Sequence, residues 1–573
     1  MPRISRRFLA TLTAGWLALA ATPALASGPP QVTETWVNDV SATSANLRAK
    51  INPEGLSTSY RFEYLTQAAY EANGDTFAGA SLAPPSGAAA VGSGNTPAAV
   101  AQHVGSLAPA TAYRYRVRAT SGAGTEYGPE RVLATTEPTN LYPPIDGRGW
   151  ELVSPVDKDG GAVGAPESIF GGGDFQAATD GETFTFSSTS SFGEAAGAPS
   201  VSQYVSSRGG SGWSTANVSA PLESGGYGDH PDGAPFRVFS EDLGRALLLD
   251  PRRCEAGEEC PRSYSLRETA TGALTPLPAE AAGMRVVGVS PDLGRILFEN
   301  EGGEVFAWSG GGLVPSPAPP APSTERVIGP HRLFVSTAEI PPFDNTDANT
   351  GEPDAEVYLE GPPPGGGPSR LICISCNPSG ERPRGSASIP GAVANGSTVL
   401  YKPRVLSAGG NRVFFDSADR LITPDTDSRP DVYEWEADGV GSCTSSPGCV
   451  GLVSGGRGEG GRFLDASADG RDAFFLTGDS LIGADPGSID VYDFRAGGGF
   501  PEPAAPFVCA GDACQALPSP PEDPAPATLA PTSGNPPLKI ERLKGGKPHC
   551  RKGKVRRHGR CVRKHHHGSG GQR

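Results

Sequence analysis

The sequence has few of the features that mark helical, membrane-spanning or hydrolytic proteins. Long amphipathic patterns are hard to find, and no run after the N-terminal segment approaches the roughly 20 apolar residues of a membrane helix. Five of the 8 histidines lie in the last 25 residues. There is no Gly-x-Ser-x-Gly elbow, and no glycine-rich loop leads into Lys-Ser/Thr. We therefore predict no catalytic residues and no organic cofactor.

Glycine and proline, in contrast, are abundant, with 78 and 57 of the 573 residues. This level indicates disorder unless the two residues fall at regular turns. Here they do fall at turns, because short runs of Val, Leu, Phe and Tyr alternate with clusters of Gly, Asp, Asn, Ser and Pro. That pattern is typical of an all-β protein, and the length allows several domains.

The N-terminal segment indicates export. Three arginines in the first seven residues precede the mostly apolar run Phe8–Ala21, and Ala24-Leu25-Ala26 places small residues where signal peptidase cleaves. We predict a signal peptide at residues 1–26, export by the general secretory route, and an extracellular or cell-wall-associated protein without a transmembrane segment.

The ten cysteines fall in close pairs, and an even number in an exported protein predicts disulfides. The five local bridges that we predict are Cys254–Cys260, Cys373–Cys376, Cys443–Cys449, Cys509–Cys514 and Cys550–Cys561. The spacing of Cys373 and Cys376 also fits a redox pair or half a zinc site. A disulfide is favoured because the sequence has no second such pair and no βαβ pattern around this one.

Residues 31–137 contain strands with alternating apolar and polar residues, such as 45–51 and 113–119, as in a β-sandwich. The segment 107–113, Leu-Ala-Pro-Ala-Thr-Ala-Tyr, resembles the tyrosine corner of fibronectin type III domains, and Trp36 fits that family. The resemblance implies a spacer or adhesion module without chemistry of its own.

A unit of roughly 40 to 60 residues recurs between residues 150 and 508. Its first half is a polar turn before an apolar strand, as in Ser240–Leu248, Ser290–Phe298, Ser407–Phe415 and Ser467–Phe475. Its second half is a strand that starts near an acid and contains an aromatic residue, as in Glu304–Trp308, Ala355–Leu359, Asp431–Trp435 and Asp490–Phe494. Four short strands per unit are typical of a propeller blade.

The alternation of Ser-x-Asp-Gly-Arg with Asp-Val-Tyr resembles the blades of TolB-like β-propellers. The resemblance implies a β-propeller over residues 150–508 with six blades, or seven if the gap at 377–403 forms another. We expect Trp150–Ser154 to pair with the last unit and close the ring, which would remove exposed sheet edges.

Three aspartates, Asp425, Asp427 and Asp431, precede Val432-Tyr433 in one unit. Three interpretations remain open: a structural turn, a weak Ca²⁺ site of the extracellular kind, and a catalytic carboxylate pair. The structural turn is favoured because Asp side chains bond their own backbone in such loops, and an EF-hand loop would have a ligand and a glycine where Arg429 and Pro430 stand. Ca²⁺ is thus the one cofactor candidate.

The C-terminal part changes charge. Residues 509–538 form a Pro/Ala-rich linker, and residues 539–573 carry 13 Lys or Arg and one acid. The candidate residues for binding anionic envelope polymers are Arg551, Lys552, Lys554, Arg556, Arg557, Arg560, Arg563 and Lys564. A solvated tail that balances an acidic body is the alternative, and no recognition fold for nucleic acid is present.

Together these features predict a non-enzymatic, monomeric, exported binding or scaffold protein whose propeller binds a protein or glycan. The alternative is a secreted glycosidase or peptidase with its active site at the propeller channel. Acids at the channel mouth, one with a strongly shifted pKa, would favour the hydrolase, whereas loops lined by aromatic residues would favour the binding protein.

Overall fold

The computed structural model describes residues 28–137, 145–164, 174–193, 201–219, 235–249, 263–319, 325–390, 393–395, 398–501, 550, 552, 554–558 and 560–563. The predicted signal peptide and two of the predicted disulfides, Cys254–Cys260 and Cys509–Cys514, lie outside these residues. The chain divides into two compact units, Met1–Pro503 and Ala504–Arg573. The regular secondary structure of the described part is nearly all strand, which confirms the all-β prediction. The described part contains no helix with the length and apolarity to cross a membrane.

The first unit begins with a β-sandwich. One sheet consists of β1 (Gln31–Asn38), β2 (Ser44–Asn52) and β6 (Ala98–Gly105). The other consists of β4 (Ser81–Ala83), β3 (Thr58–Thr66), β7 (Ala112–Ser121) and β8 (Gly124–Tyr127), with β5 (Ala89–Gly92) on β3 and β9 (Arg131–Ala134) on β7. The helix α1 (Gln67–Ala72) follows β3. Alternate residues of β2 and β7 are buried between the sheets, and the Ala108 amide donates to the Tyr113 hydroxyl at 2.8 Å, as in a tyrosine corner.

In the described residues six four-stranded antiparallel sheets follow, each with its strands in the order of a propeller blade. The first three sheets are β11 (Gln176–Ala177), β12 (Thr183–Ser188), β13 (Ser202–Arg208) and β14 (Trp213–Asn217); β15 (Phe236–Phe239), β16 (Arg245–Leu249), β17 (Tyr264–Glu268) and β18 (Leu274–Pro276); and β19 (Arg285–Val289), β20 (Ile296–Glu299), β21 (Val305–Trp308) and β22 (Val314–Pro315). The short 3-10 helix η2 (Ala279–Ala281) lies between β18 and β19.

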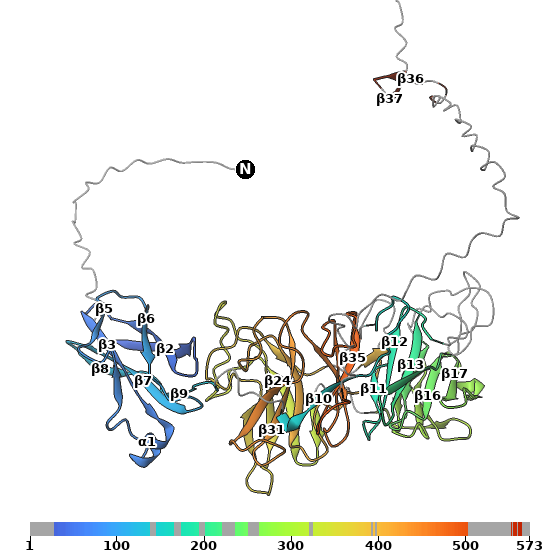
Figure 1. The fold of residues 1–573 in the computed structure, drawn as a ribbon, viewed down its shortest axis with the longest axis horizontal. Helices are drawn as coiled ribbons and strands as arrows, with labels where there is room; N and C mark the ends of the chain where they lie inside the picture. The colour runs from blue at the N-terminus through green and yellow to red at the C-terminus, as the bar shows by residue number, and fades with distance from the viewer. Residues whose placement is uncertain are drawn as a thin grey trace, which may run out of the picture. The chain divides into compact units, whose positions relative to one another are not determined.

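The next three sheets are β23 (Arg326–Ile328), β24 (His331–Ser336), β25 (Glu356–Gly361) and β26 (Arg370–Cys373); β27 (Ala387–Ser388), β30 (Arg412–Ser417), β31 (Asp431–Ala437) and β32 (Gly448–Leu452); and β33 (Arg462–Ala466), β34 (Ala473–Thr477), β35 (Asp490–Arg495) and β10 (Gly149–Leu152). In Figure 1, sheets that follow one another in the chain lie side by side, as β11 to β13 and then β16 and β17 show.

The ring closes as the sequence predicts, because β10 pairs with β35 and so joins the start of the propeller to its last sheet. The rings of Trp150 and Phe494 lie 5.7 Å apart, and the Trp150 indole donates to the Val453 carbonyl at 2.8 Å. The 3-10 turn η1 (Ile145–Gly147) leads into β10. The gap at 377–403 is not a further four-stranded sheet in the described residues: it holds β27 and the hairpin of β28 (Val393–Asn395) and β29 (Thr398–Tyr401).

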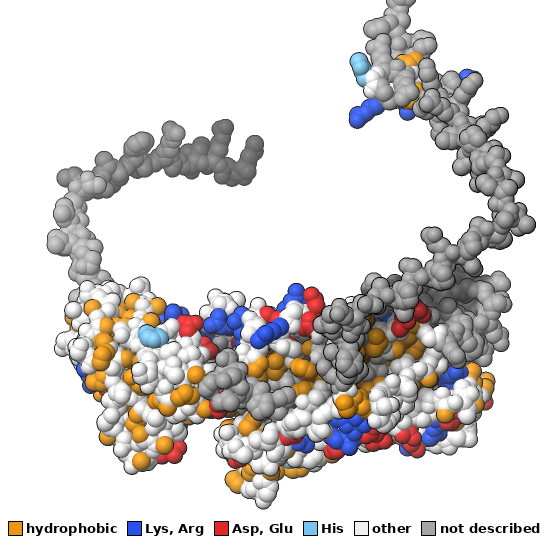
Figure 2. Space-filling model, in the orientation of Figure 1, with side chains coloured by type: hydrophobic (Ala, Val, Ile, Leu, Met, Phe, Trp, Pro, Cys, Tyr) orange, Lys and Arg blue, Asp and Glu red, His pale blue; other side chains and the backbone are white. Residues whose placement is uncertain are grey.

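Aromatic side chains fill the space between neighbouring sheets. Phe184 of the first sheet stacks on Phe474 of the sixth, with ring centroids 4.5 Å apart, and Phe414 of the fifth stacks on Phe463 of the sixth at 5.2 Å. On the face seen in Figure 2, basic and acidic side chains lie close to one another and not in separate areas of one sign. The hydrophobic core of the propeller therefore lies between neighbouring sheets.

The second unit, taken by itself, contains a short hairpin in its described residues. Its strands are β36 (Lys554–Arg557) and β37 (Arg560–Arg563), and a disulfide joins Cys550 to Cys561. Of the predicted polyanion-binding residues, Lys552, Lys554, Arg560 and Arg563 are exposed here. Arg551 and Lys564, and the side chains of Arg556 and Arg557, lie outside the described part.

Candidate functional site

The repeated Ser-x-Asp turn has a hydrogen-bonding reason. In the second sheet the Ser240 hydroxyl donates to Asp242 at 2.6 Å and accepts the Arg245 amide at 2.9 Å, while the Gly244 amide donates to Asp242 at 2.9 Å. The third and sixth sheets repeat this arrangement around Ser290 and Ser467. The side chains thus satisfy the backbone of a tight turn between the first two strands of each sheet.

These turns meet one another around the ring. The backbone hydrogen bonds that join them run from Ala408 to Ala468, from Ala468 to Thr179, from Thr179 to Glu241 and from Glu241 to Pro291, at 2.8 to 2.9 Å. They connect five of the six sheets in the order fifth, sixth, first, second, third. Arg245 adds a side-chain bond to the carbonyl of Asp292 in the next sheet, at 2.7 Å.

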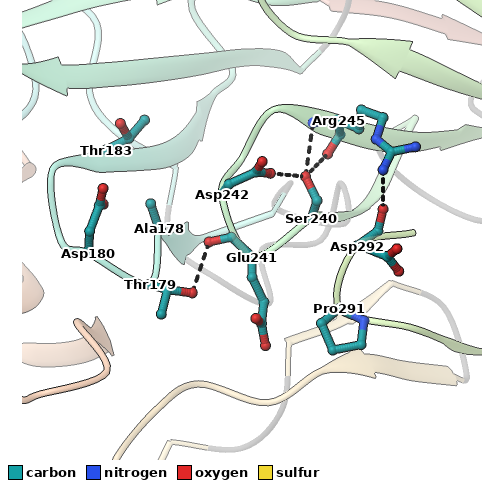
Figure 3. A pocket seen from close by; sticks show the side chains of 10 residues that line it. All are labelled: Ala178, Thr179, Asp180, Thr183, Ser240, Glu241, Asp242, Arg245, Pro291 and Asp292. Atoms are coloured by element: carbon teal, nitrogen blue, oxygen red, sulfur yellow. Dashed lines mark hydrogen bonds between the residues drawn. The ribbon is translucent and has the colours of Figure 1, made fainter. Parts of the chain in front are cut away.

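The turns of the first three sheets enclose a pocket of about 550 Å³ (Figure 3). Its lining residues are Ala178, Thr179, Asp180, Thr183, Ser240, Glu241, Asp242, Arg245, Pro291 and Asp292. Four are acids and one is basic. Sequence reasoning missed this pocket, although the signal was present: acids recur at the same turn position of consecutive units, and a ring brings consecutive turns together.

The pocket acids are placed to carry negative charge. The hydrogen bond from Ser240, followed by the amide of Gly244, lowers the pKa of Asp242. Ser290 and the Gly294 amide lower the pKa of Asp292 in the same way. Both carboxyls are therefore ionised at neutral pH and attract cations.

The space inside the ring of inner strands is crossed by the chain itself. Strand β29 contacts the innermost strands β15 and β19, and the hydroxyl of its last residue, Tyr401, donates to Asp465 of β33 at 2.6 Å. The Arg404 amide donates to the same carboxylate at 2.7 Å, and its guanidinium donates to the Ala177 carbonyl of β11 at 2.5 Å. Burial raises the pKa of Tyr401 far above its usual value. The accessible pocket thus lies at the turns.

The structure brings the three predicted aspartates of the fifth sheet together. One carboxylate oxygen each of Asp425, Asp427 and Asp431 lies within 4.8 Å of the other two. The turn interpretation accounts for several oxygens, since Asp425 accepts the Asp427 amide at 3.2 Å, Asp427 accepts the Arg429 amide at 2.8 Å, and Tyr433 donates its hydroxyl to Asp425. Burial raises the pKa of Asp425 to about 6; the Tyr433 hydrogen bond opposes this rise and Asp431 adds to it.

The acid that opens the third strand is held by a serine in three sheets. Ser454 donates to Asp431 at 2.5 Å, Ser154 donates to Asp490 at 2.5 Å, and Ser375 donates to Glu356. Each serine also accepts the amide of the valine after the acid, at 2.8 to 3.0 Å. The acid before Val-Tyr therefore has a structural role in each of these three sheets, independent of any ligand.

Glu356 leads to a pH prediction. Burial raises its pKa to about 8, and the Ser375 hydrogen bond opposes the rise. Because the folded chain holds a proton that the unfolded chain releases above about pH 4.3, this group's stabilisation is complete below that pH and is lost as the pH rises through about 8. We expect Glu356→Gln to raise the melting temperature relative to the wild type more at pH 8.5 than at pH 5.

The control for this measurement is Glu360→Gln, which changes an exposed acid on the same strand. Its effect on the melting temperature should be the same at both pH values. Equal pH dependence of the two variants would contradict the assignment of a raised pKa to Glu356.

Two further predicted features can be placed. Disulfides join Cys373 to Cys376 and Cys443 to Cys449, so neither of the first two thiols is available to zinc. Of the histidines outside the tail, His103 lies 2.9 Å from Asn46 and His331 lies 3.1 Å from the Pro362 carbonyl. Neither of these two faces a serine in the part of the chain that the structure describes.

Comparisons with known proteins concern the fold alone. No protein-family model matches the chain, and no curated protein sequence matches it. The β-propeller domain of the Trilobed protease from Pyrococcus furiosus is 9% identical, with 81% of this chain and 94% of that chain covered and a TM-score of 0.23. The third fibronectin III domain of human KIAA0343 protein is 20% identical, with 22% and 98% covered and a TM-score of 0.15.

The sensor domain of the anti-sigma factor RsgI4 in Pseudobacteroides cellulosolvens is 16% identical, with 19% of this chain and 96% of that chain covered and a TM-score of 0.14. Likenesses at these identities and TM-scores carry no argument about activity. The sandwich and the propeller are assigned from the strands and sheets described above.

Proposed function

We propose that this chain is an exported binding protein whose TolB-like propeller is the binding platform, and that the pocket at the turns takes a positively charged ligand group. The observation that carries the proposal is the excess of acids in the pocket. Asp180, Glu241, Asp242 and Asp292 are exposed around it, and the one basic group, Arg245, already donates to a backbone carbonyl. Carboxylates that line one concave surface raise the local concentration of a cationic partner.

The ligand class is a lysine- or arginine-containing peptide segment. A volume of about 550 Å³ accommodates such side chains. The described lining residues do not favour hydrolysis. Ser240 is bonded to Asp242, and no histidine is among these residues. The pKa values of Asp242 and Asp292 are lowered, whereas a general acid needs a raised one.

The place of action is proposed to be extracellular or at the cell wall. The disulfides of the described residues support an oxidising compartment, which agrees with the sequence of residues 1–26. The exposed basic residues of the β36–β37 hairpin support an association with anionic envelope polymers. The sandwich is then the spacer of the same chain.

Removing the pocket charge tests the proposed function. The variant Asp180→Asn/Glu241→Gln/Asp292→Asn keeps the size of the side chains and removes three charges. We expect its affinity for an oligolysine peptide to fall by about tenfold or more at low salt, with a smaller dependence on salt concentration. Fluorescence anisotropy of the labelled peptide measures both quantities.

The matched control removes three exposed acids elsewhere, in Asp159→Asn/Glu304→Gln/Glu352→Gln. This control has the same net charge as the pocket variant, so it should retain most of the peptide affinity. If the two variants lose affinity equally, the effect comes from net charge, and the pocket is not the site.

A further inference from the structure

The fifth and sixth propeller sheets hold equivalent buried acids in the same frame. Asp431 begins β31 and accepts from Ser454, while Asp490 begins β35 and accepts from Ser154, both at 2.5 Å. Both acids are 0% exposed. The two sites share this serine contact but differ in the groups around the second oxygen of the acid, which in Asp490 accepts from the Ser488 hydroxyl at 2.8 Å.

The sixth sheet supplies its own cation. Lys158, four residues after Ser154, places its ammonium 2.6 Å from Asp490, with both side chains buried. A buried carboxylate needs either such a cation or a proton, as at Glu356, because an unpaired buried charge is strongly destabilising.

The fifth sheet has no such cation and has one more acid. The residue four after Ser454 is Gly458, which has no side chain to take the place of Lys158. Two residues after Asp425 stands Asp427, whereas Gly487 follows Asp485 at the same distance in the sixth sheet. In the described part of the chain, no basic side chain forms an ion pair with Asp425, Asp427 or Asp431.

Two oxygens of this cluster are left without a partner. The Oδ2 atoms of Asp427 and Asp431 are buried and accept no hydrogen bond, although Asp431 is fully buried. The turn uses only the other oxygen of each residue. Buried acceptors without partners are rare in folded proteins, and here two lie in one cluster of carboxylates.

The approach of the neighbouring loop encloses the cluster. The Gly456 amide donates to Asp431 at 3.2 Å, and a side chain at Gly456 would place its Cβ 2.9 Å from the Asp425 Cα. Only glycine allows this approach, and Gly456 also has a positive φ of 65°.

We infer that Asp425, Asp427 and Asp431 bind a calcium ion, which takes the place that Lys158 fills in the sixth sheet. The ligand atoms are all oxygens, so a hard cation is favoured over zinc or copper. Ca²⁺ suits an irregular loop better than Mg²⁺, which demands near-octahedral geometry, and carbonyl oxygens and water complete its coordination. The turn interpretation and the metal site are compatible because Asp427 and Asp431 each offer the ion an oxygen that the turn does not use. Asp425 would contribute an oxygen that also accepts a hydrogen bond, from the Asp427 amide or the Tyr433 hydroxyl.

Calcium titration of the full chain by calorimetry tests the inference, with Asp427→Asn as the variant. Asparagine retains the turn acceptor for the Arg429 amide but removes the charge. We expect the wild type to bind Ca²⁺ with a dissociation constant of about 0.1 to 1 mM and to melt at a higher temperature in Ca²⁺ than in EDTA. In Asp427→Asn the affinity should fall by about tenfold or more, while the melting temperature in EDTA stays equal or rises.

The matched control is Asp469→Asn. Asp469 accepts the amide of Arg471 at 3.0 Å, the same turn contact that Asp427 makes with Arg429, but it lies in another loop. It should leave the Ca²⁺ affinity unchanged. The inference is overturned if the wild type shows neither heat of binding nor a shift in melting temperature, if Asp427→Asn binds as the wild type does, or if Mg²⁺ binds more tightly than Ca²⁺.

Discussion

Arg148→Met is expected to lower the free energy of unfolding of the propeller by about 3 to 5 kcal/mol. The Arg148 guanidinium lies 2.7 Å from the Glu434 carboxylate, and the two side chains are 0% and 1% exposed. The same guanidinium donates to the carbonyls of Gly470, Arg471 and Phe494 at 2.6 to 2.7 Å. The substitution would leave the buried Glu434 with only its longer contact to Arg412, at 3.5 Å, and would remove one donor from each of the three carbonyls. Both losses occur at the point where the chain enters the closing strand β10. Urea unfolding followed by tryptophan fluorescence measures the loss.

A double variant separates the stranded charge from the lost packing. In Arg148→Met/Glu434→Gln both members of this ion pair are gone, while Arg412 keeps its pairs with Asp146 and Glu436. The loss should therefore be smaller than in the single variant. The exposed Arg295, which contacts Ser316, provides the control, and Arg295→Met should change the free energy of unfolding by about 0.5 kcal/mol or less. A loss in Arg148→Met no larger than in this control would contradict a role in holding the fifth and sixth sheets together.

Lys158→Met is the second change with a large expected effect, again about 3 to 5 kcal/mol. The Lys158 and Asp490 side chains are 2% and 0% exposed, so the substitution leaves Asp490 buried without a cation. Lys158→Met/Asp490→Asn should recover much of this loss because no charge is then buried. Urea unfolding at pH 7 measures both variants.

The same experiment bears on the fifth sheet. If a buried acid in this frame needs a cation, removing Lys158 is costly, whereas removing the charge of Asp427 in the absence of Ca²⁺ is not. Equal stability of Lys158→Met and the wild type would show that the frame tolerates an unpaired Asp490, and the comparison between the two sheets would then lose its physical basis.

The repeating elements could be predicted from the sequence because they depend on neighbours in the chain. A turn such as Ser240-Glu-Asp242 satisfies its own backbone, and the alternation in 113–119 sets which residues face the core. The pairing of Trp150–Ser154 with the last sheet could also be predicted from the sequence. An open stack of sheets would expose unpaired strand edges, and pairing the first strand with the last sheet removes them. The gap at 377–403 could not be assigned, since it has no repeat of its own.

The pocket and the buried ion pairs depend on distance in space. Asp180, Asp242 and Asp292 are some 50 or more residues apart, and only the ring places their turns around one space. Arg148 meets Glu434 across 286 residues, and Lys158 meets Asp490 across 332. No local pattern marks either basic residue as buried.

The sequence by itself determined that the chain is all-β, where its turns fall, which cysteines lie close enough to pair, and that three aspartates share one loop. Those properties follow from contacts between residues near in sequence. The tertiary structure decided that β29 and the residues after it cross the ring, that acids from three sheets line one pocket, and that one buried carboxylate has a lysine while its counterpart has none. These outcomes depend on which side chains the closed ring brings together and removes from water. The free energy of burying and pairing those charged groups arises only in the folded chain.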